Sequence, residues 1–168
     1  VAEATVQAIL SAMPKVLVVT KRRALPRLAA SPGVEVIHDL LDDYHPMGGI
    51  HAGLRRLKTS HAFVCACDMP LIQPRLIAAL WEARADYEAV VPVWDGRRQP
   101  LCALYARAAA PAIGTALARG AAPLGGLCES LRVRFFLEEE VAAADPRGLS
   151  FLDIDTPADY ARAQGLRA

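Results

Sequence analysis

The chain has 168 residues, of which 54% are hydrophobic and 22% are charged, and its formal net charge is +1. This length fits one compact domain with a sizeable core, and the composition is that of a soluble globular protein, not a disordered one. The small net charge gives no case for nucleic-acid binding, since no basic run extends beyond Lys21-Arg22-Arg23. No apolar stretch reaches the roughly 18 residues of a membrane-spanning helix, so we expect no membrane span.

The four cysteines stand at positions 65, 67, 102 and 128 and form neither a Cys-x-x-Cys pair nor a cluster with zinc-ligand spacing. Cys65 and Cys67 alternate along a predicted strand, so we expect both on one face, packed as small hydrophobic side chains. The amino terminus lacks the basic start and cleavage site of a signal peptide. Without a disulfide framework, the reducing cytoplasm is the expected location.

Helical and strand patterns alternate through the first half of the chain. Helices are predicted over residues 2–13, 50–58, 74–85, 107–118 and 123–131, and a terminal helix opens at Thr156-Pro157. Strands are predicted over residues 16–19, 34–37, 63–67, 89–93, 101–105 and 132–137. The alternation predicts one α/β domain over residues 1–168, with a mostly parallel sheet between helices. The turn signal Asp95-Gly96 predicts a hairpin, which makes the later part of the sheet mixed.

The first predicted element is a helix, with no strand and no glycine-rich loop ahead of it. A doubly wound sheet normally enters through a central strand, and the turn after that strand is the usual phosphate-binding loop. A sheet without this strand would have two neighbouring unpaired edges. We therefore expect the full-length protein to carry a further strand and a glycine loop ahead of Val1.

The segment that ends at Asp68 carries the strongest chemical signal. An apolar run from Ala62 to Cys67 stops at this acidic residue, and Pro70 follows two positions later. The pattern places Asp68 at the carboxyl end of a buried strand, where open α/β sheets bind their ligands. A carboxylate at that position is a natural ligand for a hard cation such as Mg²⁺. The alternative is that Asp68 caps the helix that begins near Pro74.

Five short motifs follow one another along the chain. They are Val36-Ile37-His38-Asp39, Pro46-Met47-Gly48-Gly49-Ile50, Cys67-Asp68-Met69-Pro70, Gln99-Pro100-Leu101 and Asp153-Ile154-Asp155-Thr156-Pro157-Ala158-Asp159. Each motif is common by itself, but their order and spacing resemble the molybdenum cofactor guanylyltransferases of the MobA type, within the nucleotidyltransferase superfamily. The resemblance covers nearly the whole chain. It implies a three-layer α/β/α, Rossmann-like mixed sheet of the nucleotide-diphospho-sugar transferase type.

The resemblance implies transfer of GMP from GTP to molybdopterin or molybdenum cofactor, with release of pyrophosphate and with Mg²⁺ as cofactor. Asp68 matches the family's catalytic, metal-binding aspartate. Asp39 matches an aspartate that contacts the nucleotide, although a turn-capping carboxylate remains the alternative for it. Gly48 and Gly49 match a tight turn in which glycine lets backbone N–H groups approach the nucleotide closely. We expect Asp39 and Asp68 to open onto one cleft at the carboxyl ends of adjacent strands.

Other residues match the acceptor side of the family's cleft. Gln99 and Pro100 fall where the family binds its acceptor. Arg97 and Arg98 precede them and either attract an anionic pterin phosphate or are exposed hairpin charges. The histidines at positions 45 and 51 are expected to face solvent instead of acting as ligands.

The chain departs from the family's pattern in two places. Asp153 and Asp155 stand where the family usually has asparagines that face the acceptor. Sibling cytidylyltransferases carry the Asp-x-Asp-Thr-Pro variant, in which a second carboxylate can join the metal, so Asp155 is a second candidate metal ligand. The family's amino-terminal glycine-rich loop and its lysine have no counterpart here.

These departures leave other functions open. A related nucleotidyltransferase that uses CTP or a sugar-phosphate acceptor is one alternative, and a catalytically inactive nucleotide-binding module is another. Molybdoenzyme chaperones are candidate partners of a guanylyltransferase.

Overall fold

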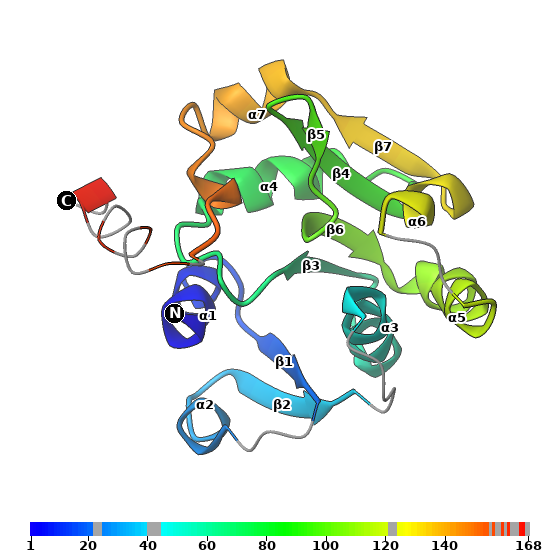
Figure 1. The fold of residues 1–168 in the computed structure, drawn as a ribbon, viewed down its shortest axis with the longest axis horizontal. Helices are drawn as coiled ribbons and strands as arrows, with labels where there is room; N and C mark the ends of the chain where they lie inside the picture. The colour runs from blue at the N-terminus through cyan, green and yellow to red at the C-terminus, as the bar shows by residue number, and fades with distance from the viewer. Residues whose placement is uncertain are drawn as a thin grey trace.

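The structure is a computed structural model that describes residues 1–21, 25–39, 45–120, 124–154, 156, 159, 161 and 165–166. Figure 1 shows the order of the elements along this chain. The helices are α1 Ala2–Leu10, α2 Pro26–Ala29, α3 Pro46–Arg56, α4 Pro74–Glu82, α5 Ala110–Ala118, α6 Leu124–Ser130 and α7 Glu138–Ala144, with short 3₁₀ turns η1 Arg107–Ala109 and η2 Leu149–Phe151. The strands are β1 Val16–Thr20, β2 Val34–His38, β3 His61–Cys65, β4 Ala89–Trp94, β5 Arg97–Arg98, β6 Cys102–Ala106 and β7 Val133–Phe136.

The described strands form two separate sheets. β1 and β2 make a parallel two-stranded sheet. The other five strands follow the order β3-β6-β4-β5, and β7 also pairs with β4. β6 runs antiparallel to both β3 and β4, whereas β7 runs parallel to β4, so β3, β4 and β7 point the same way. The prediction of a mixed sheet in an α/β fold is confirmed.

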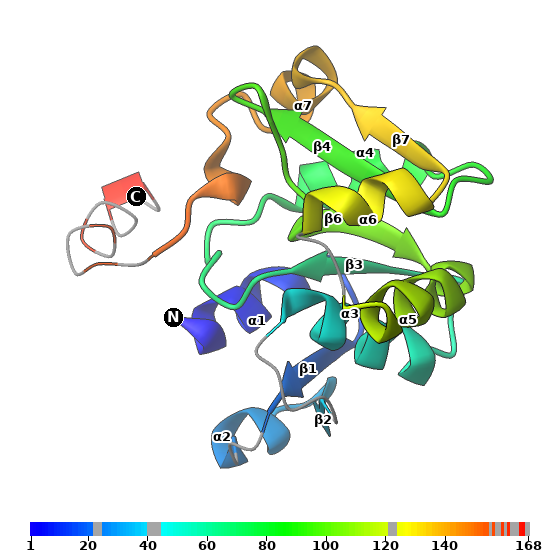
Figure 2. The ribbon, with the colours of Figure 1, turned by 45° about the vertical axis from the view of Figure 1, so that its right-hand side comes forward.

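Helices cover both faces of the five-stranded sheet. Successive side chains of each strand point to opposite faces, so β4 and β6 each contribute to two core clusters. Val91, Ala103 and Tyr105 belong to a core cluster that α3, α5 and α6 also build. Val90 and Leu104 belong to a second cluster, formed with α4 and α7. Figure 2 shows α3, α5 and α6 in front of this sheet and α4 behind it, which gives three layers.

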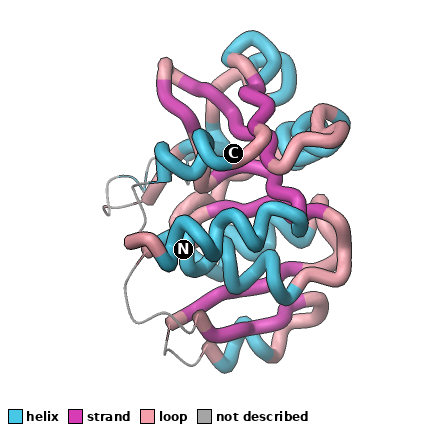
Figure 3. Tube along the Cα trace, turned by 90° about the vertical axis from the view of Figure 1, so that its right-hand side faces the viewer, coloured by secondary structure: helices cyan, strands magenta, loops and turns pink. Residues whose placement is uncertain are grey.

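Helix α1 connects the two sheets. Val6 is 5% exposed and packs with Val16 and Leu28 beside the two-stranded sheet, while Ile9 contacts both that cluster and the cluster under α4. In Figure 3 this helix lies at a level between the two groups of strands. Within the described residues, no helix combines the length and apolar character that crossing a membrane requires.

Two predicted boundaries shift in ways that affect the site. The tight turn expected at Gly48 and Gly49 is wrong, because α3 already begins at Pro46. Proline at the first helical position fixes a helical φ, and the His45 side chain accepts a hydrogen bond from the Met47 N–H, which caps the helix. Strand β3 covers residues 61–65 instead of 63–67, so Asp68 lies in a turn three residues beyond its end.

Several other elements differ from the sequence patterns. The first helix ends at Leu10, earlier than the expected residue 13. α2 and α7 have only four and seven residues, too short for helical periodicity to show in the sequence. Most of the terminal helix predicted from Thr156-Pro157 lies outside the described residues.

Candidate functional site

Asp68 lies in a turn whose backbone is held by hydrogen bonds from three directions. The Thr5 hydroxyl donates to the Cys67 carbonyl at 2.9 Å. The Ala66 N–H donates to the Leu101 carbonyl at 3.0 Å, and the Ile154 N–H donates to the Asp68 carbonyl at 3.0 Å. These bonds fix the turn against α1, the start of β6 and the chain after η2.

One oxygen of the Asp68 carboxylate is left without a partner. Its Oδ1 atom is buried and accepts no hydrogen bond from the part of the chain that the structure describes. The alternative role as a helix cap is wrong, because α4 begins after Gln73 and that cap makes no side-chain hydrogen bond. A buried carboxylate oxygen without a partner is costly, and a bound cation would satisfy it.

Two predicted acceptor-side segments meet the Asp68 turn. Cys65 at the end of β3 lies opposite Cys102 at the start of β6, so Gln99 and Pro100 come just before that junction. The Pro100 carbonyl accepts a hydrogen bond from the Tyr105 hydroxyl at 2.8 Å, which fixes its backbone.

Asp153 is exposed and precedes Ile154, which is bonded to the Asp68 carbonyl. Its charge also lies near Cys102: burial, above all, raises the pKa of that thiol, and the nearby negative charges, including Asp153, add to the shift. Asp155 lies outside the described residues. The structure therefore brings Asp68, Gln99, Pro100 and Asp153 to one end of the five-stranded sheet.

A buried carboxylate that sequence reasoning missed anchors this arrangement. Asp145 is 2% exposed and accepts hydrogen bonds from the N–H groups of Leu149 at 3.1 Å and Ser150 at 2.8 Å. The Ser150 hydroxyl in turn accepts from the Gln73 N–H at 2.9 Å. This network ties η2, and the chain that leads to Asp153, to the segment after Asp68. The only sequence signal was the turn dipeptide Asp145-Pro146, which says nothing about burial.

A second group of predicted residues lies at the ends of β1 and β2. Asp39 is 8% exposed, and its carboxylate pairs with the Lys21 ammonium at 2.8 Å. Its N–H donates to the Thr20 carbonyl, which extends the β1–β2 ladder by one step. Asp39 also acts on His51 in α3: burial and Arg55 lower the pKa of this imidazole, and the Asp39 charge opposes them.

Gly48 and Gly49 lie in the first turn of α3, beside this second group. The Gly48 N–H donates to the His45 carbonyl at 2.9 Å, so it is not free for a ligand. Gly49 differs, because a Cβ atom built on it would meet nothing within 4 Å. The helix surface at Gly49 is therefore open to close approach. His45 and His51 are half-buried, not solvent-facing: one caps α3, and the other packs against Gly114 of α5.

The prediction that Asp39 and Asp68 follow adjacent strands is wrong. β2, which precedes Asp39, pairs with β1 among the described strands, whereas β3, which precedes Asp68, pairs with β6. The two carboxylates thus mark two regions of predicted site residues, one at Asp39 and one at Asp68.

The two cysteines near Asp68 both have a raised thiol pKa. Burial, together with the charges of Cys67 and Asp68, raises the pKa of the Cys65 thiol to about 12. Burial also raises the pKa of Cys67. Cys67 is nevertheless exposed and lies beyond the end of β3, so the expectation that both thiols pack on one strand face is wrong. All four cysteines are free thiols.

The donor set around Asp68 fits a cation that takes few protein ligands. Within the described part of the chain, no three His, Cys, Asp or Glu side chains come together as a metal site. Mg²⁺ typically binds one or two carboxylates and completes its shell with substrate phosphates and water. The buried, unpartnered Oδ1 of Asp68 supplies one such ligand.

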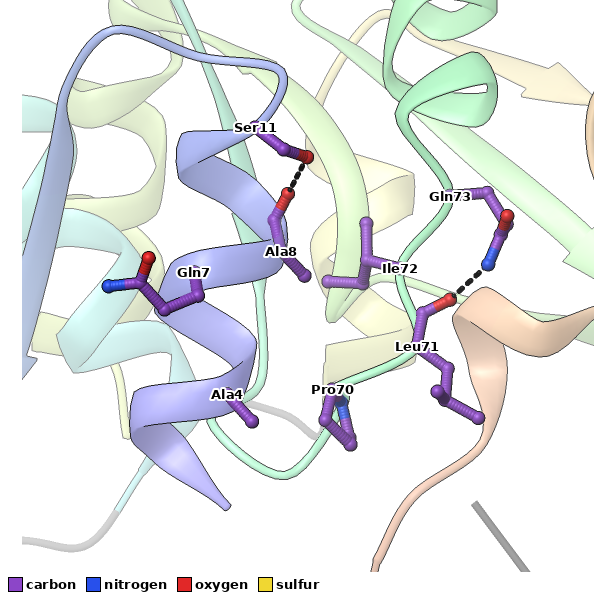
Figure 4. Close-up of a pocket in the computed structure, with 8 residues that line it drawn as sticks. All are labelled: Ala4, Gln7, Ala8, Ser11, Pro70, Leu71, Ile72 and Gln73. Carbon is purple, nitrogen blue, oxygen red and sulfur yellow. Dashed lines mark hydrogen bonds between the residues drawn. The ribbon is translucent and has the colours of Figure 1, made fainter. Parts of the chain in front are cut away.

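A separate open hollow lies between α1 and the segment that follows Asp68 (Figure 4). Its lining is formed by Ala4, Gln7, Ala8, Ser11, Pro70, Leu71, Ile72 and Gln73. Two of its polar side chains are already used, since Ser11 donates to the Ala8 carbonyl and Gln73 to the Leu71 carbonyl. The lining carries no charge, which does not suit a polyphosphate, so we do not include this hollow in the site.

The fold is that of a nucleotidyltransferase-type α/β protein. Residues 1–146 match the model of the MobA-like NTP transferase domain, and the chain belongs to that family. The match includes the predicted site residues from Asp39 to Pro100. It ends before Asp153 and Asp155, so the roles of these two residues rest on the motif resemblance alone.

Named relatives agree with this family. The chain is 33% identical over 143 residues to a Methanosarcina mazei protein named "Probable molybdenum cofactor guanylyltransferase", covering 83% of this chain and 64% of that protein. It is 33% identical over 127 residues to the molybdenum cofactor guanylyltransferase of Desulfosudis oleivorans, covering 75% of this chain and 63% of that protein. The chain thus spans less than two thirds of the length of these relatives.

Solved structures extend the likeness to the fold. The crystal structure of molybdopterin-guanine dinucleotide biosynthesis protein A from Archaeoglobus fulgidus superposes with a TM-score of 0.79 at 27% identity, over 97% of this chain and 85% of that one. A cytidylyltransferase for 2-C-methyl-D-erythritol 4-phosphate from Thermus thermophilus gives a TM-score of 0.73 at 19% identity, over 98% of this chain and 87% of that one. The second likeness shows the fold alone.

Proposed function

We propose that the protein transfers GMP from GTP to the phosphate of molybdopterin or molybdenum cofactor and releases pyrophosphate. The observation that carries the proposal is the buried, unpartnered Oδ1 of Asp68 at the carboxyl end of β3. In a member of the MobA-like family, this oxygen is suited to a cation on the phosphates of a nucleoside triphosphate. The guanine base and the acceptor come from the names of the relatives.

The reaction consists of one displacement at phosphorus. A phosphate oxygen of the acceptor forms a bond to the α-phosphorus of GTP, the bond from that phosphorus to the bridging oxygen breaks, and pyrophosphate leaves with the electron pair. Such transfers depend mainly on positioning and on neutralising the phosphate charge. Bound Mg²⁺ would supply that neutralisation. Asp68 would hold the ion, and Asp155 is our second candidate ligand.

The two regions of the site would divide the substrates between them. On the donor side, Asp39 and the open surface at Gly49 would contact the base and ribose of the nucleotide. On the acceptor side, Gln99, Pro100 and the exposed Asp153 would contact the pterin. Because the Pro100 carbonyl is bonded to Tyr105, proline would contribute an apolar surface there, not a hydrogen bond.

Transfer of CMP is the second candidate function. The observation that favours it is Asp153, an exposed carboxylate where the guanylyltransferases usually have asparagine. The cytoplasmic location and a molybdoenzyme chaperone as partner remain parts of the proposal that follow from the proposed reaction.

The test uses the full-length protein with molybdopterin, Mg²⁺ and α-labelled GTP or CTP. We expect label to appear in the dinucleotide product with GTP and not with CTP. Thermal melting without the acceptor gives an independent readout, because a nucleotide at about 100 times its Kd stabilises the fold by about 2.7 kcal/mol. Stabilisation and transfer by CTP alone would select the second candidate, and no stabilisation by either nucleotide would contradict both.

A further inference from the structure

The hairpin at the end of β4 carries two neighbouring arginines whose side chains lie on different faces of the sheet. Arg97 pairs with Trp94 and Arg98 pairs with Val93 across the antiparallel β4–β5 ladder. Directly opposite residues share a face, and successive residues along a strand alternate. Arg97 therefore lies on the Trp94 face and Arg98 on the Val93 face. Both arginines are exposed.

Arg98 already has an aromatic partner. Its guanidinium carbon lies 4.7 Å from the centroid of the Phe135 ring, which is cation–π geometry. Phe135 pairs with Val91 and packs in the core cluster under α3, α5 and α6. The Arg98 charge also lowers the pKa of Cys128 in α6, against the larger effect of burial. Arg98 thus belongs to the α5–α6 side of the sheet.

Arg97 lies on the opposite face, toward the chain that reaches Asp68. On this face the Trp94 ring stacks on Phe151 of η2, with centroids 5.9 Å apart. Gly148, at φ 60°, leaves room for Trp94, because a Cβ there would overlap the indole. The chain continues from Phe151 past Asp153 to the residue that is bonded to the Asp68 carbonyl.

The backbone places Arg97 two residues before Gln99, the first of the predicted acceptor-side residues. The Gln99 N–H donates to the Pro92 carbonyl, and the Leu101 carbonyl accepts from Ala66. β5 therefore extends the line of β6 past the point where β3 ends. In the described residues the structure records no ion pair and no ring contact for Arg97.

From these observations we infer that Arg97, and not Arg98, binds the phosphate monoester of the acceptor. The inference rests on the proposed function and deepens it by separating two residues that the sequence makes equivalent. A guanidinium binds phosphate oxygens in a bidentate, charge-assisted geometry. It would also offset the repulsion between the incoming phosphate and the triphosphate of the nucleotide.

The test is steady-state kinetics of the full-length protein, with GTP and molybdopterin varied separately. We expect Arg97→Gln to raise the KM for molybdopterin about tenfold and to leave the KM for GTP unchanged. A tenfold rise corresponds to the loss of one charged contact with the acceptor. Arg97→Lys should recover part of the loss. Arg98→Gln removes the same charge from the opposite face and is the matched control, with a molybdopterin KM near that of the wild type. Circular dichroism and melting temperature establish that each variant is folded.

Salt dependence gives a second readout. The molybdopterin KM of the wild type should rise with ionic strength more steeply than that of Arg97→Gln, because an exposed charge contact is screened by salt. Equal effects of Arg97→Gln and Arg98→Gln, or a rise in the KM for GTP instead, would overturn the inference while the proposed function stands. A wild-type protein that transfers nothing from GTP would overturn both.

Discussion

The two regions of the site differ in whether the protein supplies a partner for the carboxylate. At the end of the two-stranded sheet, Asp39 is paired with Lys21 at 2.8 Å, so its charge is neutralised within the protein. At the end of the five-stranded sheet, the Asp68 Oδ1 is also buried but accepts no hydrogen bond from the described residues. A neutralised carboxylate suits hydrogen bonds to neutral groups of a nucleotide, whereas an unpartnered one suits a cation. The contrast teaches that burial alone does not define the role of an acidic residue at a strand end.

The two sheets also differ in how deeply their strands are buried. β4 and β6 are buried along most of their length between two helical layers, while four of the five residues of β1 are only half-buried. The Asp68 turn is further fixed by the Asp145–Ser150–Gln73 network. Groups that must hold a reacting centre gain from such rigid support. We therefore expect changes near Asp68 to lower turnover and changes near Asp39 to weaken nucleotide binding.

The largest effect is expected for Asp68→Asn in the full-length protein. The substitution keeps the side-chain volume but replaces a charged ligand of the ion with a poorer amide ligand. If the ion stabilises the transition state by several kcal/mol, turnover should fall by a factor of at least ~10². The fold should persist, which circular dichroism would check. Turnover near the wild-type rate at saturating Mg²⁺ and GTP would show that Asp68 does not act through the metal.

The next effect concerns the anchor of the acceptor-side region. Asp145→Asn should lower the free energy of unfolding by about 2 kcal/mol, because one of two buried N–H donors loses a charged acceptor. In a domain of this size that corresponds to a fall in melting temperature of about 4–8 °C. Asp86→Asn is the control, since the Asp86 side chain is 89% exposed. Equal melting temperatures for both variants would refute the anchoring role.

A smaller effect is expected on the donor side. Asp39→Asn should raise the KM for GTP about tenfold with kcat changed little, because it weakens contacts made equally in the ground state and the transition state. Glu35→Gln serves as control, because Glu35 forms an ion pair with Arg56 in which both side chains are about half exposed. A large fall in kcat for Asp39→Asn would mean that the two regions act as one.

The smallest effect is a pH dependence of stability. Burial lowers the pKa of His51, and burial together with Arg84 lowers the pKa of His61. A histidine whose folded pKa is depressed binds a proton more readily when unfolded, so stability falls as the pH drops below about 6.5. Urea unfolding at pH 7.5 and pH 5.5 should show this loss, and His51→Gln should reduce it. An unchanged difference between the two pH values in His51→Gln would contradict the role of His51.

The sequence predicted what depends on local pattern. Apolar runs predicted the strands. Asp68 was predicted to follow a strand end, because the third apolar run breaks off at this acidic residue. The start of α3 was misplaced because glycines at positions 48 and 49 are typical of turns, while the helix depends on Pro46 and the His45 cap.

Other features depend on tertiary contacts that no local pattern encodes. Burial of Asp145 follows from two backbone N–H groups that reach it after the chain turns at Gly148. The difference between Arg97 and Arg98 follows from the register of β5 on β4, which a shift of one residue would reverse. The separation of Asp39 from Asp68 into two sheets was likewise hidden, because sequence order does not give strand order.

Metal binding in the absence of turnover tests the central claim most directly. The full-length protein is titrated with Mn²⁺, a paramagnetic ion that also prefers oxygen ligands, in the presence of GTP and without acceptor, and bound ion is followed by electron paramagnetic resonance. We predict tight binding in the wild type and in Asp39→Asn, and its loss in Asp68→Asn. Binding of Mn²⁺ to Asp68→Asn as tight as to the wild type would contradict the assignment of the metal to Asp68.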